Sequence, residues 1–564
     1  MSSYPNPSTA MAASIVDELV RGGVNFFVIS PGSRSTALAL AAASHSEAET
    51  RVMPDERSAS FCALGRAKAT AGPACVISTS GTAAANFLPA VVEASMSLTP
   101  LVVMTADRPI ELRGVGANQT IDQVGLYGDY VRYSGDMPAP AADVDSVGRW
   151  RSVSAMAVAS SRGASGSPGP VHLNVAFHEP TVPVSDDGRS TSVAYPFSID
   201  GRDDGAVWQG RDSGPPPTFR LEMHHRSRGL VIAGDGTYDR TAIAAVTQHL
   251  GWPLLATALS GLRGHSVVST YEHMLAAPLP ERFQPDVVVA IGSIGPSKRL
   301  ESLAASAKQQ IRIDRWGRHI DPSLNASAVV HADPVDTLEA LVGEVRAPEG
   351  WEETWFERGS HIGDLLTSLL AEDATLSGPA VAHALNQIAW ESLVVGSSLP
   401  IRDVDAYLTT PGAVVANRGA SGIDGFVSTA SGVASTSRAT LALAGDLSVL
   451  HDSNGFISDV REPLVMIVVD NNGGGLFDLL PQAHHAPEFE RLFIADPHRD
   501  LEKLADFHGI SYREANSIDD LVGVTGQFLL SEDQAMIRVP VDRSNDLRVR
   551  KTIEVAAASV LSDR

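Results

Sequence analysis

Two short apolar runs near the C-terminus each end in a cluster of polar and glycine residues. The runs are Thr440–Ala444 and Leu464–Val469, and their length and composition are typical of buried parallel strands. Gly445-Asp446-Leu447-Ser448 follows the first run, and Asp470-Asn471-Asn472-Gly473-Gly474 follows the second. The residues between them are enough for a crossover helix and its turns. We therefore expect both clusters at the carboxyl edge of one sheet, where α/β proteins bind ligands.

These clusters offer the ligands of a divalent cation. The side-chain oxygens of Asp446 and Asn471, with a main-chain carbonyl from the turn at Gly473, are ligands that Mg²⁺ prefers, its other positions going to water and phosphate oxygens. The alternative is an ordinary turn after a strand, because Asp, Asn and Gly favour such bends for local reasons. Gly234-Asp235-Gly236 also follows an apolar run, but no Asn lies at a comparable distance after it, so we interpret it as a strand-end turn only.

Length and composition bound the class of protein. A chain of 564 residues suggests about three domains. The net charge is 43 − 66 = −23, which disfavours nucleic acid and anionic membranes as partners but leaves acidic small molecules open. Cys62 and Cys75 are too few for a disulfide framework and lie in apolar contexts, which fits a reducing cytosol. Neither a leader-like start nor a bilayer-length apolar stretch is present, so we expect a soluble, cytoplasmic protein.

Three regions of the chain alternate short apolar runs with helix-like stretches, which predicts three doubly wound parallel-sheet α/β domains. We place them at residues 1–180, 227–347 and 377–564, separated by a linker at 181–226 and a charged connection at 348–376. Besides the two runs above, the expected strands are Phe26–Ile29, Arg51–Met53, Ala74–Ser78, Leu101–Met104, Val171–Val175, Leu230–Ala233, Val287–Ile291, Ile311–Ile313, Leu393–Val395, Ala413–Ala416 and Met536–Val541.

The C-terminal clusters resemble the metal and diphosphate motif of thiamine diphosphate (ThDP) enzymes, which is Gly-Asp-Gly followed after about 25 residues by Asn-Asn. Leu447 in place of the second Gly and Asp470 in place of the first Asn depart from that motif. The order of three α/β regions is similar to the pyrimidine-binding, central and diphosphate-binding domains of the ThDP decarboxylase-like superfamily. This resemblance implies ThDP as cofactor and Asp446, Asn471 and the Gly473 carbonyl as ligands of Mg²⁺, with Mn²⁺ as an alternative metal.

A ThDP site also needs a carboxylic acid beside N1′ of the aminopyrimidine. By resemblance this acid is Glu56 in Met53-Pro-Asp-Glu-Arg-Ser-Ala59, between a short strand and a helix-like stretch at Ser58–Thr70. Taken alone, Asp55 and Glu56 are better explained as first-turn helix charges. The motifs Ser30-Pro-Gly-Ser-Arg-Ser-Thr36 and Thr79-Ser-Gly-Thr82 favour the cofactor role. Because this acid and the metal ligands lie in different domains, the resemblance implies sites between chains of a homodimer or homotetramer.

Arginines distinguish members of this superfamily, because Arg forms fixed bidentate pairs with carboxylates. Arg34, Arg108, Arg402 and Arg418 lie where strands are expected to end. The motifs at 30–35, 54–59, 417–425 and 471–474 resemble the synthases of menaquinone biosynthesis that act on 2-oxoglutarate and isochorismate. That resemblance implies decarboxylation of 2-oxoglutarate and addition of the resulting succinyl carbanion equivalent to isochorismate, with release of CO₂.

The resemblance also assigns contacts. Ile423 would support the bent cofactor, and three apolar residues after the Asn-Asn-Gly-Gly turn would line the pocket by the thiazolium. The implied cofactor contacts are Ser30, Pro31, Gly32, Gly81, Ser398, Arg418, Ile423, Gly445, Asp446, Leu447, Ser448, Asn471 and Phe477. The implied substrate contacts are Ser33, Arg34, Arg108, Gln119, Arg299, Ser398, Arg402, Arg418, Leu476, Phe477 and Leu480.

Two other functions stay open at this point. A different ThDP 2-ketoacid decarboxylase or carboligase, such as an acetolactate-synthase-like enzyme, shares the cofactor motifs, but a neutral 2-ketoacid would not require so many arginines. A non-catalytic nucleotide-binding α/β protein would use the glycine-rich turns to hold phosphate. Such a protein would tolerate replacement of Glu56. His451, just after the Asp446 turn, is within reach of a phosphate or second-sphere role.

Overall fold

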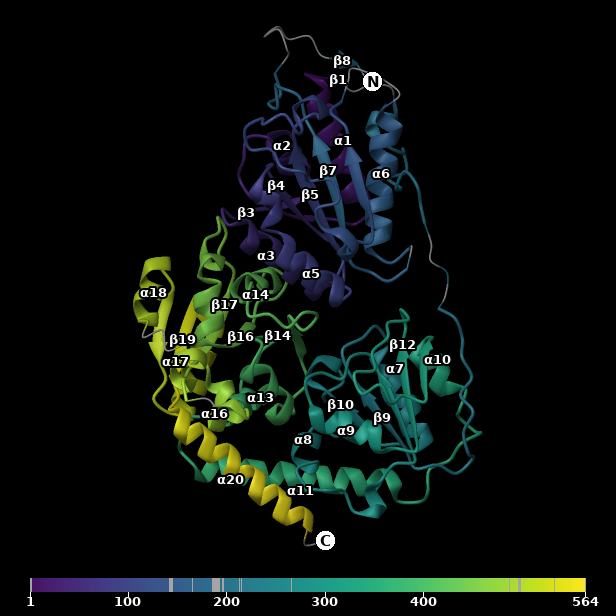
Figure 1. Ribbon diagram of the computed structural model, residues 1–564, viewed down its shortest axis with the longest axis vertical. Coiled ribbons are helices and arrows are strands. Elements are labelled where there is room, and N and C mark those ends of the chain that lie inside the picture. The colour runs from purple at the N-terminus through teal and green to yellow at the C-terminus, as the bar shows by residue number, and fades with distance from the viewer. Residues whose placement is uncertain are drawn as a thin grey trace. The chain divides into compact units, whose positions relative to one another are not determined.

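The computed structural model describes residues 3–140, 146–164, 166–184, 193–194, 197–211, 214, 216–264, 266–485, 487–495, 499–531 and 533–562 (Figure 1). The chain forms two compact units that do not follow chain order. One unit comprises Met1–Gly214, Asn417–Arg438 and Ser448–Pro463, and the other comprises Pro215–Ala416, Ala439–Leu447 and Leu464–Arg564.

The N-terminal sheet has six parallel strands in the order β3-β2-β4-β5-β7-β6. Every residue of its four central strands is buried, as expected when helices cover both faces. Phe27 and Ile29 face a core with α1, α2 and α6, whereas Phe26 and Val28 face a core with α3 and α5. The strands are β2 (Phe26–Ile29), β3 (Glu49–Val52), β4 (Ala74–Ser78), β5 (Leu101–Asp107), β6 (Ser134–Met137) and β7 (Pro170–Ala176). The helices are α1 (Pro7–Arg21), α2 (Thr36–Ser44), α3 (Glu56–Thr70), α4 (Thr82–Ala85), α5 (Leu88–Met96) and α6 (Ser146–Ser161), and a small antiparallel pair joins β1 (Ser3–Tyr4) to β8 (Val193–Ala194).

The central sheet has five parallel strands in the order β10-β9-β11-β12-β13. Alternate residues of β9 face opposite cores, with Leu230 and Ile232 on one side and Val231 and Ala233 on the other. The strands are β9 (Gly229–Ala233), β10 (Leu254–Ala256), β11 (Val287–Ile291), β12 (Gln309–Asp314) and β13 (Ala328–His331). The helices are α7 (Arg240–Leu250), α8 (Tyr271–Met274), α9 (Lys298–Ser306) and α10 (Pro334–Glu339).

The C-terminal sheet has six parallel strands in the order β15-β14-β16-β17-β19-β18. The strands are β14 (Ser392–Val395), β15 (Ala413–Ala416), β16 (Thr440–Gly445), β17 (Leu464–Asp470), β18 (Ser511–Glu514) and β19 (Gln534–Pro540). The helices in this part of the chain are α12 (Gly378–Ala384), α13 (Leu399–Tyr407), α14 (Phe426–Ala434), α15 (Asp446–His451), α16 (Gln482–His485), α17 (Phe489–Phe493), α18 (Leu501–His508), α19 (Ile518–Ser531) and α20 (Arg543–Ser562). Of these, α14 belongs to the first compact unit, where it packs on α3.

The three parallel α/β sheets confirm the predicted fold class. Every strand that the apolar runs predicted is present, with ends that differ by a few residues. In the three parallel sheets, the strands that the sequence did not reveal are β6, β10, β13 and β18, and all four lie at sheet edges. The short antiparallel pair of β1 and β8 was not predicted either. An edge strand is short or exposed along one side, so it lacks the continuous apolar run that marks a buried strand. The domain boundaries themselves stay a prediction.

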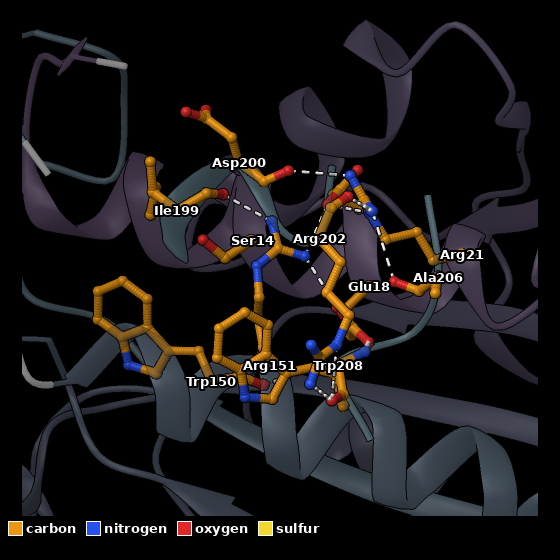
Figure 2. Close-up of polar contacts among 12 residues, drawn as sticks. Ser14, Glu18, Arg21, Trp150, Arg151, Ile199, Asp200, Arg202, Ala206 and Trp208 are labelled. Atoms are coloured by element: carbon orange, nitrogen blue, oxygen red, sulfur yellow. Dashed lines mark hydrogen bonds and ion pairs between the residues drawn. The ribbon is translucent and has the colours of Figure 1, made fainter. Parts of the chain in front are cut away.

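The predicted linker is partly packed onto the N-terminal unit (Figure 2). Arg151 of α6, fully buried, donates hydrogen bonds to the carboxylate of Glu18 at 2.8 Å and to the main-chain oxygen of Ile199 at 2.6 Å. Arg21 of α1 donates to the main-chain oxygen of Asp200 at 2.9 Å. These contacts fix the start of the segment 197–211, while residues 185–192, 195–196, 212–213 and 215 of the predicted linker lie outside the described residues.

The predicted connection folds as a helix of 22 residues, α11 (Trp351–Glu372). Its buried residues recur every three or four positions, from Trp351 and Trp355 through Ile362 and Leu366, and so form one apolar face. The helices α11 and α20 contact each other within the second unit (Figure 1). Among the described residues, no helix has the length and apolar character needed to cross a bilayer.

Candidate active site

The strand ends that carry the predicted metal ligands are neighbours. β16 and β17 pair in parallel with Gly445 opposite Val469, so Asp446 and Asn471 follow adjacent strand ends at one carboxyl edge. This arrangement confirms the expectation that the two polar clusters share one sheet edge. The crossover between them contains α15, which begins at Asp446.

Asp446 is a buried carboxylate with unused bonding capacity. It is 4% exposed, and its Oδ2 has no hydrogen-bond partner among the residues that the structure describes. Burial raises the pKa of Asp446 to about 6, and the negative charge of Asp470 adds to this effect, while the backbone amides of Leu447 and Gly473 oppose it. Because a buried charged oxygen without a partner is costly, this donor set fits a bound cation.

The turn after β17 brings Asn471 to the same edge. Asn472, Gly473 and Gly474 have φ angles of 58°, 81° and 74°, three left-handed residues in succession. A Cβ added at Gly475 would lie 2.5 Å from the side-chain nitrogen of Asn471, so the Asn471 amide packs directly on the Gly475 backbone. Asn471 and Gly445 also line one small cavity of about 20 Å³. The turn thus holds the Asn471 side chain close to the end of β16.

Asp470, which departs from the family motif, is engaged elsewhere. Its carboxylate accepts hydrogen bonds from Nε of Arg538 at 2.6 Å and from the backbone N–H of Asn472 at 3.2 Å. Arg538 also bonds Glu514 at 2.6 Å. Asp470 therefore stabilises the turn internally and has a different environment from Asp446.

The apolar residues after the turn lie on and beside the 3₁₀-helix η8 (Gly475–Leu479). Leu476, Phe477 and Leu480 are half-buried. The Phe477 ring lies 5.5 Å from the ring of Phe493, centroid to centroid. These side chains therefore form an apolar wall next to the Asn471 turn.

Two predicted substrate residues of the second unit, Arg299 and Arg402, lie near one carboxylate. Ser398 precedes α13 with a φ of 76°, an unusual conformation for a residue with a side chain. Arg299 donates to the main-chain oxygen of Glu272 at 2.9 Å and also pairs with Glu554. Burial raises the pKa of Glu272, and the positive charges of Arg299 and Arg402 oppose this, so both arginines lie near Glu272. Sequence reasoning did not identify Glu272 as their partner.

The segment after β2 lies against the segment after β4 in the first unit. Ser30 is 1% exposed, and its Oγ has no hydrogen-bond partner among the described residues. A Cβ added at Gly32 would lie 2.3 Å from Cβ of Thr79, so only glycine permits this approach. Pro31 and Ser33 are exposed beside it. Two of the predicted cofactor motifs are therefore in contact.

Arg34 and Arg108 are brought together by the ends of β2 and β5. Burial lowers the pKa of Arg108, and the positive charge of Arg34 lowers it further. Arg108 donates a hydrogen bond to the Ser80 hydroxyl, and Arg34 pairs with the exposed carboxylate of Glu179 at 2.9 Å. Two adjacent guanidinium groups favour an anion with more than one carboxylate.

Two glutamines hold the Ser80–Gly81 segment. Gln119, with a φ of 54°, donates to the main-chain oxygen of Ser80 at 3.1 Å. Gln123, which is 1% exposed, accepts from the Gly81 N–H at 2.8 Å and donates to the Asn174 side chain at 2.9 Å. Sequence reasoning named Gln119 and missed Gln123, although it lies four residues further along.

Glu56 is the first residue of α3 and is half-buried. Asp55, the residue before it, caps the helix by accepting from the Ser58 N–H at 3.2 Å. The helix thus begins two residues earlier than predicted, because Asp55 provides the cap. Arg57 donates to the main-chain oxygen of His451 at 2.7 Å, so His451 contributes its carbonyl to the packing of α3.

The glycine-rich segment 417–425 is fixed by a buried carboxylate. Glu93 of α5 accepts from the N–H groups of Gly419 at 2.9 Å and Ala420 at 2.7 Å, and Lys68 pairs with it at 2.8 Å. Sequence reasoning missed Glu93, although it is the one charged residue in the mostly apolar stretch 88–96. Of the remaining predicted cofactor contacts, Gly81 and Ser448 are buried, whereas Arg418, Ile423 and Leu447 are half-buried.

The described residues contain no group of three or more His, Cys, Asp and Glu side chains that could hold a metal. The predicted metal site supplies only one such side chain, Asp446, together with an amide and a main-chain carbonyl. The predicted metal site is therefore of a different kind from such a group.

The sequence matches two family profiles that define the class of protein. Residues 9–126 match "Thiamine pyrophosphate enzyme, N-terminal TPP binding domain", and residues 215–393 match "Middle domain of thiamine pyrophosphate". Thiamine pyrophosphate is another name for ThDP. Together with the three parallel sheets, these matches place the chain among the ThDP enzymes.

Relatives over the full length narrow this class. The chain is similar to the protein named 2-succinyl-5-enolpyruvyl-6-hydroxy-3-cyclohexene-1-carboxylate (SEPHCHC) synthase in Thermobifida fusca. The two are 39% identical over 99% of this chain and 100% of the relative. Proteins of the same name in Salinibacter ruber and Rubrobacter xylanophilus are 35% and 36% identical to this chain, each over at least 98% of both chains. The chain belongs to the SEPHCHC synthase family, a group of ThDP-dependent enzymes that form carbon–carbon bonds.

Proposed function

We propose that the chain uses ThDP and Mg²⁺ to decarboxylate 2-oxoglutarate and to add the succinyl carbanion equivalent to isochorismate. The products would be SEPHCHC and CO₂, in menaquinone biosynthesis. Membership of the synthase family supports the reaction. The structural observation that carries the proposal is the buried, unpartnered Oδ2 of Asp446 beside the Asn471 turn.

Asp446, Asn471 and the Gly473 carbonyl would hold the metal. Their oxygens suit Mg²⁺, and the same set accommodates Mn²⁺. The backbone around Gly445 and the N-terminal end of α15 would face the diphosphate, because N–H groups at the start of a helix attract anions. The site would thus neutralise the diphosphate with one cation and backbone donors.

Glu56 would hold a proton at N1′ of the aminopyrimidine. When bound, ThDP supplies the electron sink that decarboxylation of a 2-ketoacid requires. Leu476, Phe477 and Leu480 would exclude water from the thiazolium side of the pocket, and Ile423 would support the cofactor from below. The polypeptide would therefore hold the proton at N1′, support the cofactor and exclude water from the pocket.

The arginines would place the dicarboxylate substrates. Arg34 lies near enough to Arg108 to lower its pKa, and Glu179 on Arg34 is an exposed acid that a substrate carboxylate would displace. Gln119 donates to the main-chain oxygen of Ser80, and the backbone N–H of Arg34, next to Ser33, donates to the Thr79 hydroxyl. Arg299 and Arg402, near Glu272, and Arg418, on the segment fixed by Glu93, would complete the set.

The direct test combines enzyme, Mg²⁺ and ThDP with 2-oxoglutarate, with and without isochorismate, and measures CO₂ and the coupled product. We expect CO₂ release to be coupled to product formation, and both to stop when EDTA removes the metal. Glu56→Gln should bind Mg²⁺ and ThDP but lose turnover by about 10²–10⁴-fold, the usual contribution of a positioned acid. Full activity of that variant, or CO₂ release that never leads to ligation, would overturn the assignment.

A complementation experiment tests the assembly. We propose that each site takes Glu56 from one chain and Asp446 from its partner in a cytosolic homodimer or homotetramer. Glu56→Gln and Asp446→Asn homomers should each be inactive. An equimolar mixture of the two should recover roughly a quarter of wild-type activity after subunit exchange, since half the dimers are then mixed and each mixed dimer has one intact site of two. No recovery after confirmed subunit exchange would contradict sites shared between chains.

A further inference from the structure

The C-terminal helix α20 begins against the segment that carries Asn471. Its first residue, Arg543, donates two parallel hydrogen bonds to the carboxylate of Asp478, at 2.8 Å from Nε and 2.9 Å from Nη2. The same guanidinium bonds Glu490 at 3.0 and 3.2 Å. Asp478 lies in η8, between the metal-ligand turn and Leu480. One arginine therefore ties two points of the segment 475–490 to the helix.

The cavities around Asn471 show how closely α20 approaches it. Asn471 lines two small cavities, of about 20 and about 10 Å³. α20 contributes Asp546 and Arg550 to the first and Arg543 and Asp546 to the second. Each holds about one water molecule at most. The start of α20 and Asn471 therefore line the same two small cavities.

This part of α20 is itself rigidly held. Asp546 accepts hydrogen bonds from the Gly378 N–H at 2.8 Å and from Nε of Arg550 at 2.7 Å. Arg550 forms a bidentate pair with the buried carboxylate of Asp403 on α13. The first turns of α20 are thus fixed to two other helices, which makes them a firm support for a loop.

The segment that α20 supports has little regular structure of its own. Asn472, Gly473 and Gly474 are all left-handed, and η8 is five residues long. The Asp478 and Arg543 side chains are only 17% and 24% exposed, and their geometry is bidentate. Such a pair constrains a loop more than an isolated surface ion pair does. The bonds to Asp478 and Glu490 raise the pKa of Arg543, which keeps it charged.

We propose that Arg543 is a positioning residue that, through Asp478, holds the turn 471–480 in the conformation that binds metal and diphosphate. This inference rests on the proposed function, because that function assigns the metal to Asn471 and Gly473. Arg543 itself touches neither the metal nor the substrate. Its role is to keep a glycine-rich turn ordered before the cofactor arrives.

The test compares Arg543→Ala and Arg543→Lys with Arg548→Ala. Arg548 lies on the same helix and forms a comparable pair with Asp373, at 2.9 and 3.4 Å, away from the turn. Hydrogen exchange of residues 471–485 is measured in the metal-free protein, and ThDP binding is measured by calorimetry with Mg²⁺. Arg543→Ala should speed exchange in this segment and raise the Kd for ThDP by about 10-fold or more, the effect of losing a residue that orients a metal ligand.

Arg543→Lys should give exchange rates and a Kd between those of wild type and Arg543→Ala, because lysine keeps the positive charge but cannot form the bidentate pair. Asp478→Asn should reproduce the alanine phenotype, and the double variant should be no worse than either single one. Arg548→Ala should change neither exchange in 471–485 nor the Kd. If Arg543→Ala fails to fold, Arg543→Lys and Asp478→Asn are compared with Arg548→Ala by the same two measurements.

The inference is overturned if the Arg543 and Asp478 variants bind ThDP as tightly as wild type does and hydrogen exchange in residues 471–485 is unchanged. It is also overturned if Arg548→Ala weakens binding as much as Arg543→Ala does, because the effect would then be general destabilisation. Failure of wild type to bind ThDP with Mg²⁺ would instead remove the proposed function on which the inference rests.

Discussion

Two aspartates in this chain follow a glycine at the end of a buried parallel strand, and their surroundings differ. Asp235, after β9, is exposed, and its main chain forms a pair of 2.8 Å hydrogen bonds with Ser293. Asp446, after β16, is 4% exposed, with one carboxylate oxygen unpartnered among the described residues. The same dipeptide therefore gives a closed turn in one sheet and a candidate cation site in another.

The neighbouring strand accounts for the difference. Next to β9, the strand β11 is followed by Gly292-Ser293, and the Ser293 backbone pairs with Asp235 at the edge. Next to β16, the strand β17 ends in a left-handed turn, and the Gly473 amide reaches the Asp446 carboxylate without satisfying its second oxygen. A Gly-Asp motif thus becomes a site only when the adjacent strand leaves the edge open and supplies further ligands.

The largest expected effect comes from exchanging the two aspartates for asparagine. Asp446→Asn should raise the Kd for ThDP in the presence of Mg²⁺ by more than about 100-fold, because even residues that only orient a ligand are worth 10- to 100-fold. Asp235→Asn should leave the Kd within about twofold, as expected for an exposed group outside the site. Calorimetric titrations of both variants measure this difference. Similar Kd values for the two would remove the distinction between the turns.

A methyl group at Gly475 should have the next largest effect. Gly475→Ala places a carbon 2.5 Å from the Asn471 side-chain nitrogen, so the side chain must move while the protein still folds. We expect about a 10-fold weaker affinity for Mg²⁺ in the presence of ThDP. Gly236→Ala, in the turn at Asp235, meets its nearest atom at 3.1 Å and serves as the matched control with unchanged affinity. Normal Mg²⁺ affinity of Gly475→Ala would contradict the role of Asn471.

Asp470→Asn should affect stability more than binding. Arg538 would lose a partner at 2.6 Å, and we expect the free energy of unfolding to fall by about 1–2 kcal/mol, given that Arg538 is partly exposed. The Kd for ThDP should stay within about threefold of wild type, because Asp470 is engaged by Arg538 and is not a proposed ligand. Urea unfolding and calorimetry measure the two effects. A loss of binding as large as that of Asp446→Asn would make Asp470 a ligand as well.

The pH dependence of stability should differ least between the variants. It shows at which pH values the binding measurements are free of unfolding. Burial lowers the pKa of His172 to about 4 and that of His273 to about 3, below the usual 6.5. The unfolded chain therefore binds more protons below about pH 6.5, and each histidine should reduce the free energy of unfolding by about 1.4 kcal/mol per pH unit down to its folded pKa.

Asp235→Asn should show the same decline as wild type in urea unfolding between about pH 6.5 and 4.5. His172→Gln should make the decline shallower. A wild-type stability that stays constant over this range would contradict neutral burial of both histidines. Binding comparisons above about pH 7 then report on the site and not on unfolding, since these two histidines are neutral in both states there.

Much of the fold could be predicted because buried parallel strands carry continuous apolar runs, as β5, β7 and β17 do. Edge strands such as β6 and β18 alternate or lack apolar residues, so their pattern did not separate them from loops. The helix α11 was predicted only as a connection, because charged residues such as Glu352, Glu353 and Glu357 interrupt its apolar stripe. Local pattern therefore located the sheet interiors better than their margins.

The sequence by itself determined that Asp446 and Asn471 follow strand ends at one carboxyl edge, because two strands joined by a crossover run parallel. That β16 and β17 are direct neighbours is known only from the structure. Only the tertiary structure decided which polar groups remain available there. Arg538 engages Asp470 from 68 residues away, and Arg543 reaches Asp478 from 65 residues away. Gln123 and Glu93 likewise act through backbone groups of other segments. Such partners are set by packing between distant elements, and local residue patterns carry no record of them.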